Sequence, residues 1–333
     1  MISLPAVEEV LADAAVVSLP MRVRFRGITT REALLLRGPA GWGEFAPFPE
    51  YADEEAALWL QSAIEHAWLG PPPAIRSAVP INATVPAVAA AAVPAVLERY
   101  PGAQTAKVKV AEHGQTLGDD LARVNAVRAL IPNVRIDSNG GWSVDEAEEA
   151  LRALSADGPL EYAEQPCASV SELVEVRRRV PEVRVAADES IRRAEDPMKV
   201  VRAGGADVAV VKVAPLGGMR RLLSLADELS AHGVPVVVSS ALDTAVGIAA
   251  GTAAAAALPD LPLACGLGTG GLFESDVAPP HVPVGGKLAV RAVIPDTTRI
   301  EALAAPAERS RWWTERARRC HGLLDKRDGL FFV

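Results

Sequence analysis

The sequence predicts an α/β protein: a TIM-type (β/α)7β barrel with an α+β capping domain formed by the N-terminal region and the C-terminal tail. Two observations predict this fold. From residue 79 onward, short apolar segments alternate with segments of helical periodicity, a pattern typical of parallel strands joined by helices. Five consecutive apolar segments also end in a charged residue, at intervals of 24 to 28 residues, close to the roughly 30 residues per unit of an eightfold βα barrel.

Residues 1–78 differ from the rest of the chain and are expected to form the N-terminal part of the capping domain. Its expected antiparallel strands are residues 16–25, 33–37 and 41–45. A helix is expected to begin at Asp53, because the acidic residues that start this segment stabilise a helix N-terminus. The run of prolines at 71–73 ends the helix and provides a linker.

Residues 79–285 are expected to form the catalytic barrel. Several of its strands are apolar on both faces, as buried parallel strands are. The expected strands are residues 81–85, 106–110, 134–137, 160–164, 183–188, 208–213, 234–239 and 262–265. Helical periodicity between them is found in residues 117–131, 144–154, 170–180 and 219–231. Beyond residue 285 the alternation lapses, so residues 286–333 are expected to return to the capping domain.

Charge and composition exclude several classes of partner. A formal net charge of −8 argues against a nucleic-acid partner, because such proteins present a basic surface to phosphates. The densest basic stretch, residues 309–319, contains Trp312 and Trp313. We expect a terminal helix that packs its tryptophans, and a membrane-surface or anion-binding helix is the alternative.

The cysteines and the apolar segments point to a cytoplasmic protein that does not enter a membrane. Cys167, Cys265 and Cys320 are far apart and form no Cys-x-x-Cys pair, so neither a disulfide framework nor a zinc site is indicated. The N-terminus has no pattern of a secretory signal. The most apolar segment, residues 244–258, is shorter than the roughly 20 residues that span a bilayer.

Three carboxylates end the third, fourth and fifth expected barrel strands: Asp137, Glu164 and Asp188. The active site of such a barrel lies at the carboxyl ends of its strands, and adjacent strands are about 4.8 Å apart. Carboxylates at that spacing repel one another unless a cation joins them, and an all-oxygen set suits Mg²⁺ or Mn²⁺. The alternative role, as helix N-caps after βα turns, explains one such residue better than three in succession.

Lysines end the strands on either side of these carboxylates. Lys107 and Lys109 share one face of the second strand, because side chains alternate along a strand, and Lys212 ends the sixth. Lysines facing each other across a metal ion can remove a proton next to a substrate carboxylate, while the metal holds the negative charge that develops.

These residues, in this order and spacing, resemble the enolase superfamily and within it the muconate-lactonizing enzyme subgroup. The similarity covers nearly the whole chain. It is carried by Lys107-Val-Lys109, Asp137-Ser-Asn-Gly, Ala163-Glu-Gln-Pro, Ala187-Asp-Glu-Ser, Val211-Lys-Val, Val238-Ser-Ser-Ala-Leu-Asp-Thr, Gly266-Leu-Gly-Thr-Gly and the N-terminal Gly41-Trp-Gly-Glu-Phe-Ala-Pro-Phe-Pro-Glu-Tyr. Each motif is weak alone, and the ordered set is specific.

The resemblance implies a small-molecule carboxylate substrate and a role for each residue. The three carboxylates would bind Mg²⁺, with Mn²⁺ as a possible substitute; Lys109 would be the catalytic acid and base, Lys107 would hold it in position, and Lys212 would face it across the substrate. The implied reaction is dehydration of 2-succinyl-6-hydroxy-2,4-cyclohexadiene-1-carboxylate to o-succinylbenzoate in menaquinone biosynthesis. N-succinylamino acid racemisation, which uses the same two lysines, is the near alternative.

Other relatives and reactions fit the sequence less well. None of the five histidines is expected at a strand end, which argues against members that use a histidine base. The eighth strand lacks the Asp-x-Asp pair of dipeptide epimerases. A class I aldolase with Lys212 as a Schiff-base lysine is a distant alternative, which the three carboxylates disfavour.

Four further residues are candidate substrate contacts: Ser239, Gly268, Thr269 and Arg135. Ser239 ends the seventh strand, where its hydroxyl could bind a substrate carboxylate or cap a helix. Gly268 and Thr269 belong to a Gly-x-Gly-x-x-Gly run that follows the last strand and is not followed by a convincing helix, so a substrate-carboxylate loop is favoured over a dinucleotide site. Arg135 is expected to point into the barrel, where it would neutralise the carboxylates or touch substrate.

Overall fold

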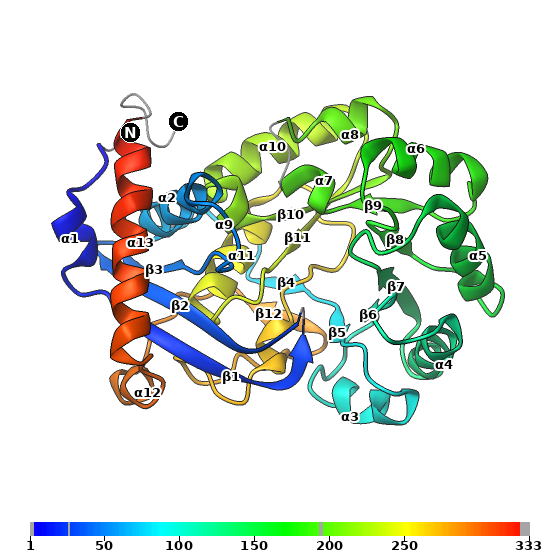
Figure 1. The fold of residues 1–333 in the computed structure, drawn as a ribbon, viewed down its shortest axis with the longest axis horizontal. Helices are drawn as coiled ribbons and strands as arrows, with labels where there is room; N and C mark the ends of the chain where they lie inside the picture. Colours follow the sequence, from blue (N-terminus) through cyan, green and yellow to red (C-terminus); the bar gives the residue numbers. More distant parts are fainter. Residues whose placement is uncertain (1–2, 26, 193–195, 327–333) are drawn as a thin grey trace.

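The computed structural model describes residues 3–25, 27–192 and 196–326 (Figure 1). The outermost parts of the expected capping domain and tail, residues 1–2 and 327–333, lie outside this range. Two large hydrophobic cores are present. One is formed mainly by residues 79–267, and the other joins the N-terminal elements to the loop after β11 and the C-terminal helix.

The N-terminal elements are an antiparallel sheet and a helix packed on it. β1 (Ala15–Phe25), β2 (Ile28–Gly38) and β3 (Gly41–Phe45) lie in that order, after a short helix α1 (Val7–Leu11) and before α2 (Asp53–Leu69). The predicted strands and helix are therefore confirmed. Gly43 permits close packing of α2, since a Cβ atom there would lie 2.0 Å from the carbonyl oxygen of Ala63.

A parallel, curled sheet of seven strands follows. Its order is β11 (Val236–Ser239), β10 (Val208–Lys212), β9 (Val185–Ala187), β8 (Tyr162–Glu164), β7 (Asn133–Asp137), β6 (Thr105–Lys109) and β5 (Ala83–Val85). Seven of the eight expected strands are confirmed, several of them shorter than predicted. Within the sheet, Lys109 lies beside Asp137 and Asp137 beside Glu164, so that these strand ends are level with one another.

The structure corrects the prediction of an eighth strand at residues 262–265. This segment forms no ladder and contributes isolated parallel bridges, from Cys265 to Ile81 near one edge of the sheet and from the next residue, Gly266, to Ser239 at the other. Pro262 lacks an N–H group for a ladder, and the chain turns away at the glycines that begin at Gly266. The segment still joins the two edge regions of the sheet.

Helices lie outside the curled sheet (Figure 1). They are η1 (Ala90–Ala92), α3 (Val93–Leu97), α4 (Leu117–Arg128), α5 (Val144–Ser155), α6 (Val170–Arg179), α7 (Glu189–Arg192), α8 (Lys199–Arg202), α9 (Val213–Leu216), α10 (Met219–Ala231) and α11 (Ala245–Ala257). The four predicted long helices are confirmed. Thr116, Ser143 and Ser169 begin α4, α5 and α6 with reciprocal capping boxes, which satisfy N–H groups that a helix start leaves without partners.

The C-terminal residues return to the N-terminal elements. β12 (Lys287–Ala289) pairs with β4 (Ala78–Pro80), and α12 (Thr297–Ala302) leads into α13 (Ala307–Asp325). Trp313 of α13 is buried and its Nε1 donates to Glu32 of β2 at 2.9 Å, so the expected packing of the terminal helix is confirmed. The division of the chain at residues 78 and 285 stays a prediction.

A helix that crosses a bilayer must be both about 20 residues long and predominantly apolar. Among the described residues 3–25, 27–192 and 196–326, none of the helices meets both requirements for crossing a membrane.

Candidate active site

The structure brings the charged strand ends together at one end of the curled sheet. Lys107, Lys109, Asp137 and Glu164 belong to β6, β7 and β8, Asp188 directly follows β9, and Lys212 ends β10. All six side chains are buried. Three of them, Asp137, Glu164 and Asp188, are called the carboxylate cluster below.

Each carboxylate of the cluster contacts a lysine. Lys107 Nζ lies 2.7 Å from Glu164 Oε1 and 3.1 Å from Asp137 Oδ2. Lys109 Nζ lies 2.6 Å from the same Asp137 oxygen. At the other end of the cluster, Lys212 forms an ion pair with Asp188. The cluster therefore separates Lys109 from Lys212, as the strand order requires.

Burial and neighbouring charges act on the three carboxylates in different directions. Burial, together with repulsion from Asp137 and Asp188, raises the pKa of Glu164 to about 7. Burial alone would also raise the pKa of Asp188, but Lys212 and Arg192 outweigh it and lower this pKa to about 2. In the same way, the two lysines of β6 hold the pKa of Asp137 well below its usual range despite burial. Glu164 is therefore the carboxylate of the cluster whose negative charge is least compensated by its neighbours.

The donor atoms fit a hard divalent cation. As the side chains stand, the described part of the chain contains no group of three or more His, Cys, Asp or Glu residues arranged to hold a metal ion, and a lysine ammonium group contacts each carboxylate of the cluster. One carboxylate oxygen, Glu164 Oε2, is nevertheless buried without a hydrogen-bond partner among the described residues. A buried all-oxygen donor set with an unpartnered oxygen suits Mg²⁺ or Mn²⁺ better than softer metals.

Arg192 and Tyr51 extend the site toward the N-terminal elements and were not singled out from the sequence. Arg192 Nε donates to Asp188 Oδ1 at 3.2 Å, and its Nη2 donates to Glu189 at 2.7 Å. Its Nη1 donates to the hydroxyl of Tyr51 at 3.0 Å, which lies in the loop between β3 and α2. The spacing of four residues between Asp188 and Arg192 at a helix start was the available sequence signal.

Asn139 and Phe25 hold the end of Lys109. The Lys109 ammonium donates to Asn139 Oδ1 and lies 5.3 Å from the centre of the Phe25 ring, a cation–π contact. Asn139 has a positive φ of 50°, and its N–H donates to Asp137 Oδ1 at 3.0 Å. The Asp137-Ser-Asn139 motif was noted in the sequence, but the orienting role of Asn139 depends on this backbone conformation.

A small cavity lies above the cluster and receives two of the predicted substrate contacts. Ser239 and Thr269 line it together with Ser240 and Thr84. The hydroxyls of Ser240 and Thr269 are 2.6 Å apart. Thr84 Oγ1 is buried without a hydrogen-bond partner among the described residues, so it is a candidate contact that sequence reasoning missed.

Gly268 and Arg135, also predicted as substrate contacts, lie elsewhere. Gly268 lines a neighbouring cavity, and its backbone packs against the residue before β5: a Cβ atom there would lie 2.8 Å from the carbonyl oxygen of Asn82. Arg135 does point into the curled sheet, but it lies two residues below Asp137. Its Nη1 donates to the carbonyl of Ala264 at 2.6 Å, and its Nε pairs with Glu161. These partners hold Nη1 and Nε away from the carboxylate cluster, while Nη2 is buried without a hydrogen-bond partner among the described residues.

Comparison with known proteins agrees with the sequence resemblance. The model for enolase N-terminal domain-like proteins matches residues 16–67, and that for enolase C-terminal domain-like proteins matches residues 87–295. The o-succinylbenzoate synthase of Mycobacterium tuberculosis is 64% identical over 321 residues, which is 96% of this chain and 97% of the relative. That of Mycobacterium marinum is 64% identical over 314 residues, covering 94% and 95%.

A solved structure shows the same fold at low sequence identity. The muconate lactonizing enzyme from Pseudomonas putida superposes with a TM-score of 0.71 at 22% identity, covering 88% of this chain and 98% of that one. The family models, the long alignments at 64% identity and this shared fold point to one conclusion. The chain belongs to the o-succinylbenzoate synthase family of the enolase superfamily.

Proposed function

We propose that this chain dehydrates 2-succinyl-6-hydroxy-2,4-cyclohexadiene-1-carboxylate to o-succinylbenzoate, a step of menaquinone biosynthesis. The observation that carries the proposal is the placement of Lys109 and Lys212 at opposite ends of one buried carboxylate cluster. That arrangement would place a substrate carboxylate between the two lysine side chains and beside the oxygens of the three acidic side chains. The relatives at 64% identity bear the name of this activity.

Asp137, Glu164 and Asp188 would hold a divalent cation, for which we propose Mg²⁺, with Mn²⁺ as a functional substitute. Enolase superfamily enzymes generally use such a metal. When bound, the cation supplies positive charge for the substrate carboxylate, whose oxygens gain electron density as the adjacent proton leaves. Arg192 holds Asp188 in place from the other side, and Tyr51 in turn holds Arg192.

Lys109 is the proposed acid and base. Its neutral amine takes the proton from the ring carbon that bears the carboxylate, and the electron pair moves into that carboxylate. The electron pair then returns to form the last double bond of the ring as the bond from the ring to the hydroxyl group breaks, and the same lysine gives the proton to the departing hydroxide, so that water and an aromatic ring are formed. Asn139 and Phe25 orient the amine, which places it close to the reacting carbon without a search among rotamers.

Lys212 and Lys107 have supporting roles in this proposal. Lys212 supplies positive charge on the opposite face of the substrate. Burial lowers the pKa of Lys212, although Asp188 partly opposes this effect. Burial would also lower the pKa of Lys107, but Glu164 and Asp137 raise it well above the usual value. Lys107 is therefore a fixed cation that positions two carboxylates and does not exchange protons with substrate.

Hydroxyl groups are the proposed contacts for the remainder of the substrate. Ser239, Thr269 and Thr84 face the same small cavity, and the unpartnered Thr84 Oγ1 offers a donor to a second carboxylate.

We further propose that the sheet and residues 262–266 form a complete (β/α)7β barrel beneath a capping domain. A cytoplasmic location is supported by the three buried cysteines, which are free thiols in the described part of the chain.

The test is a direct comparison of two reactions catalysed by the purified chain with Mg²⁺. Formation of o-succinylbenzoate is followed by ultraviolet absorbance, and racemisation of N-succinyl amino acids is followed by polarimetry. We expect efficient dehydration and negligible racemisation. A larger kcat/KM for racemisation would overturn the synthase proposal and leave the lysine and metal roles standing.

A further inference from the structure

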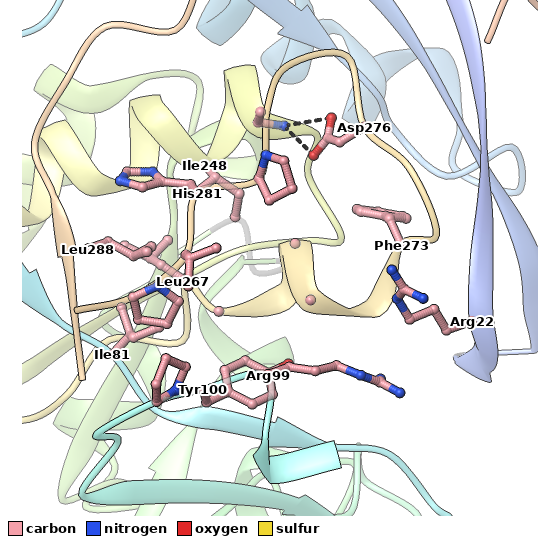
Figure 2. A pocket seen from close by; sticks show the side chains of 18 of the residues that line it. Arg22, Ile81, Arg99, Tyr100, Ile248, Leu267, Phe273, Asp276, His281 and Leu288 are labelled. Carbon is pink, nitrogen blue, oxygen red and sulfur yellow. Dashed lines mark hydrogen bonds between the residues drawn. The ribbon is translucent and has the colours of Figure 1, made fainter. Parts of the chain in front are cut away.

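A second cavity, of about 700 Å³, lies next to the proposed active site (Figure 2). The two cavities share one wall, the segment 266–271. Gly266 and Thr269 face the active-site cavity, while Gly268, Gly270 and Gly271 face the second one. The glycine-rich run noted in the sequence thus separates the two cavities, and three glycines and Leu267 form its face toward the second one.

One side of the second cavity is apolar and well packed. Ile81, Leu267 and Leu288 are at most 2% exposed as residues, and Tyr100 and Ile248 are also buried. Figure 2 shows Ile81, Leu267 and Leu288 grouped together on this side. Surfaces of this kind bind the hydrocarbon or aromatic part of a ligand, and the volume lies within the roughly 300–1,000 Å³ typical of small-molecule sites.

Two arginines, Arg22 and Arg99, lie on the other side of the cavity. Figure 2 shows the guanidinium groups of Arg22 and Arg99 toward this side, and within the described residues neither arginine forms an ion pair with an acidic side chain. Among the described residues, Arg22 Nη2 donates to the backbone carbonyl of Glu274 at 3.3 Å, and Arg22 is itself exposed. Arg99 Nη1 is buried and lacks a hydrogen-bond partner in the part of the chain that the structure describes. A buried guanidinium nitrogen without an acceptor is costly, and a ligand anion would relieve that cost.

The acidic residues of the cavity do not neutralise these arginines. Asp276 is committed to the start of α11, where it accepts from the backbone N–H of Ala245 at 3.0 Å and from that of Val277 at 2.7 Å. Glu98 and Glu274 line the cavity but are exposed to solvent. A second buried nitrogen, His281 Nε2, also lines the cavity without a hydrogen-bond partner among the described residues.

We propose that this cavity binds a small organic anion with one or two flat apolar rings and a carboxylate. The rings contact the wall of Ile81, Leu267 and Leu288, and the carboxylate accepts hydrogen bonds from Arg99. The site is separate from the carboxylate cluster, and its existence does not depend on the proposed dehydration. Because segment 266–271 also carries Thr269, an occupied cavity restrains one wall of the active site.

The test measures binding of 2-naphthoate and of its neutral isostere 2-naphthamide to the full chain by calorimetry. We expect 2-naphthoate to bind at least about tenfold more tightly than 2-naphthamide, since a hydrogen bond to a charged group is worth about this factor. Arg99→Gln should remove this preference. The matched control is Arg178→Gln on α6, an exposed arginine paired with Glu175, which should retain it.

Two further variants test whether the compounds bind in the second cavity or in the catalytic cavity. Ile248→Trp fills the apolar side and should abolish binding of both compounds, with unchanged circular dichroism as the control for folding. Lys109→Ala alters only the catalytic cavity and should leave 2-naphthoate binding unchanged. Equal affinity for the two compounds in the unaltered chain would overturn the proposal. So would loss of binding in Lys109→Ala, or an Arg99→Gln effect no larger than that of Arg178→Gln.

Discussion

Lys107→Met tests whether the buried lysine is what neutralises the carboxylate cluster in the metal-free protein. Lys107 Nζ lies 2.7 Å from Glu164 and 3.1 Å from Asp137, and the three side chains are 11%, 1% and 2% exposed. Methionine keeps most of the packing and removes the charge. Removing one partner of a buried ion pair costs about 3–5 kcal/mol, so we expect the free energy of unfolding to fall by about this amount at pH 8.5.

The loss of stability caused by Lys107→Met should also depend on pH. Burial and the neighbouring carboxylates already raise the pKa of Glu164 to about 7, and loss of Lys107 raises it further. A folded-state pKa above the unfolded value means that the folded state holds an extra proton, so stability falls as pH rises through the interval between the two values. The loss caused by Lys107→Met should therefore be smaller at pH 6 than at pH 8.5.

Urea denaturation followed by tryptophan fluorescence, in EDTA and then with Mg²⁺, provides the measurement. The matched control is Arg152→Met, which breaks an exposed pair with Glu148 at 3.0 Å and should cost about 0.3–0.5 kcal/mol. Mg²⁺ should recover part of the Lys107→Met loss, because binding to the folded state stabilises it. A loss no larger than that of Arg152→Met would refute the reasoning.

Three other predictions follow from the same structure. EDTA should abolish turnover and added Mg²⁺ or Mn²⁺ should restore it; full activity of the metal-stripped enzyme would exclude the metal role of the cluster. Lys109→Ala should reduce kcat by at least about 10³-fold, within the range for a lost acid–base group. Lys212→Arg should retain a measurable trace of activity. Equal loss of activity in both variants, in the ultraviolet assay, would contradict a single acid–base lysine. Burial and repulsion from Asp243 raise the pKa of Glu44 to about 8, so the contribution of Glu44 to stability should fall as pH rises from about 4.5 to 8. Glu44→Gln should flatten this decline in urea denaturation, and an unchanged pH profile would refute the raised pKa.

The sequence was sufficient to predict which charged residues meet. Asp137 and Glu164 end consecutive apolar segments, and parallel strands with short apolar runs place their carboxyl ends side by side. The observed register, with Lys109 beside Asp137 and Asp137 beside Glu164, follows from that rule without any knowledge of tertiary contacts. The three-stranded N-terminal sheet and the long helices were predictable for a similar reason, since their periodicity is local.

The sequence did not predict how deep within the curled sheet each inward-facing side chain lies. Arg135 and Asp137 share a face of β7, and alternation along a strand cannot tell which residue lies at the level of the substrate. The partners of Arg135, Glu161 and the carbonyl of Ala264, come from other segments of the chain. The side of a glycine-rich segment that faces the active site is equally a tertiary property, and of the two predicted contacts in this segment Thr269 lines the active-site cavity whereas Gly268 lines the second one.

Tyr51 was missed because its link to Asp188 is also a tertiary property of the chain. Nothing in the local sequence joins Tyr51 to Asp188, which lies 137 residues later in the printed sequence. Yet one arginine, Arg192, contacts both, with 3.0 Å to the Tyr51 hydroxyl and 3.2 Å to Asp188. A loop of the N-terminal elements therefore fixes the position of a proposed metal ligand on the curled sheet. Docking of these elements affects the cluster as well as access to it, because displacing Tyr51 removes one of the three side-chain partners that hold Arg192 beside Asp188.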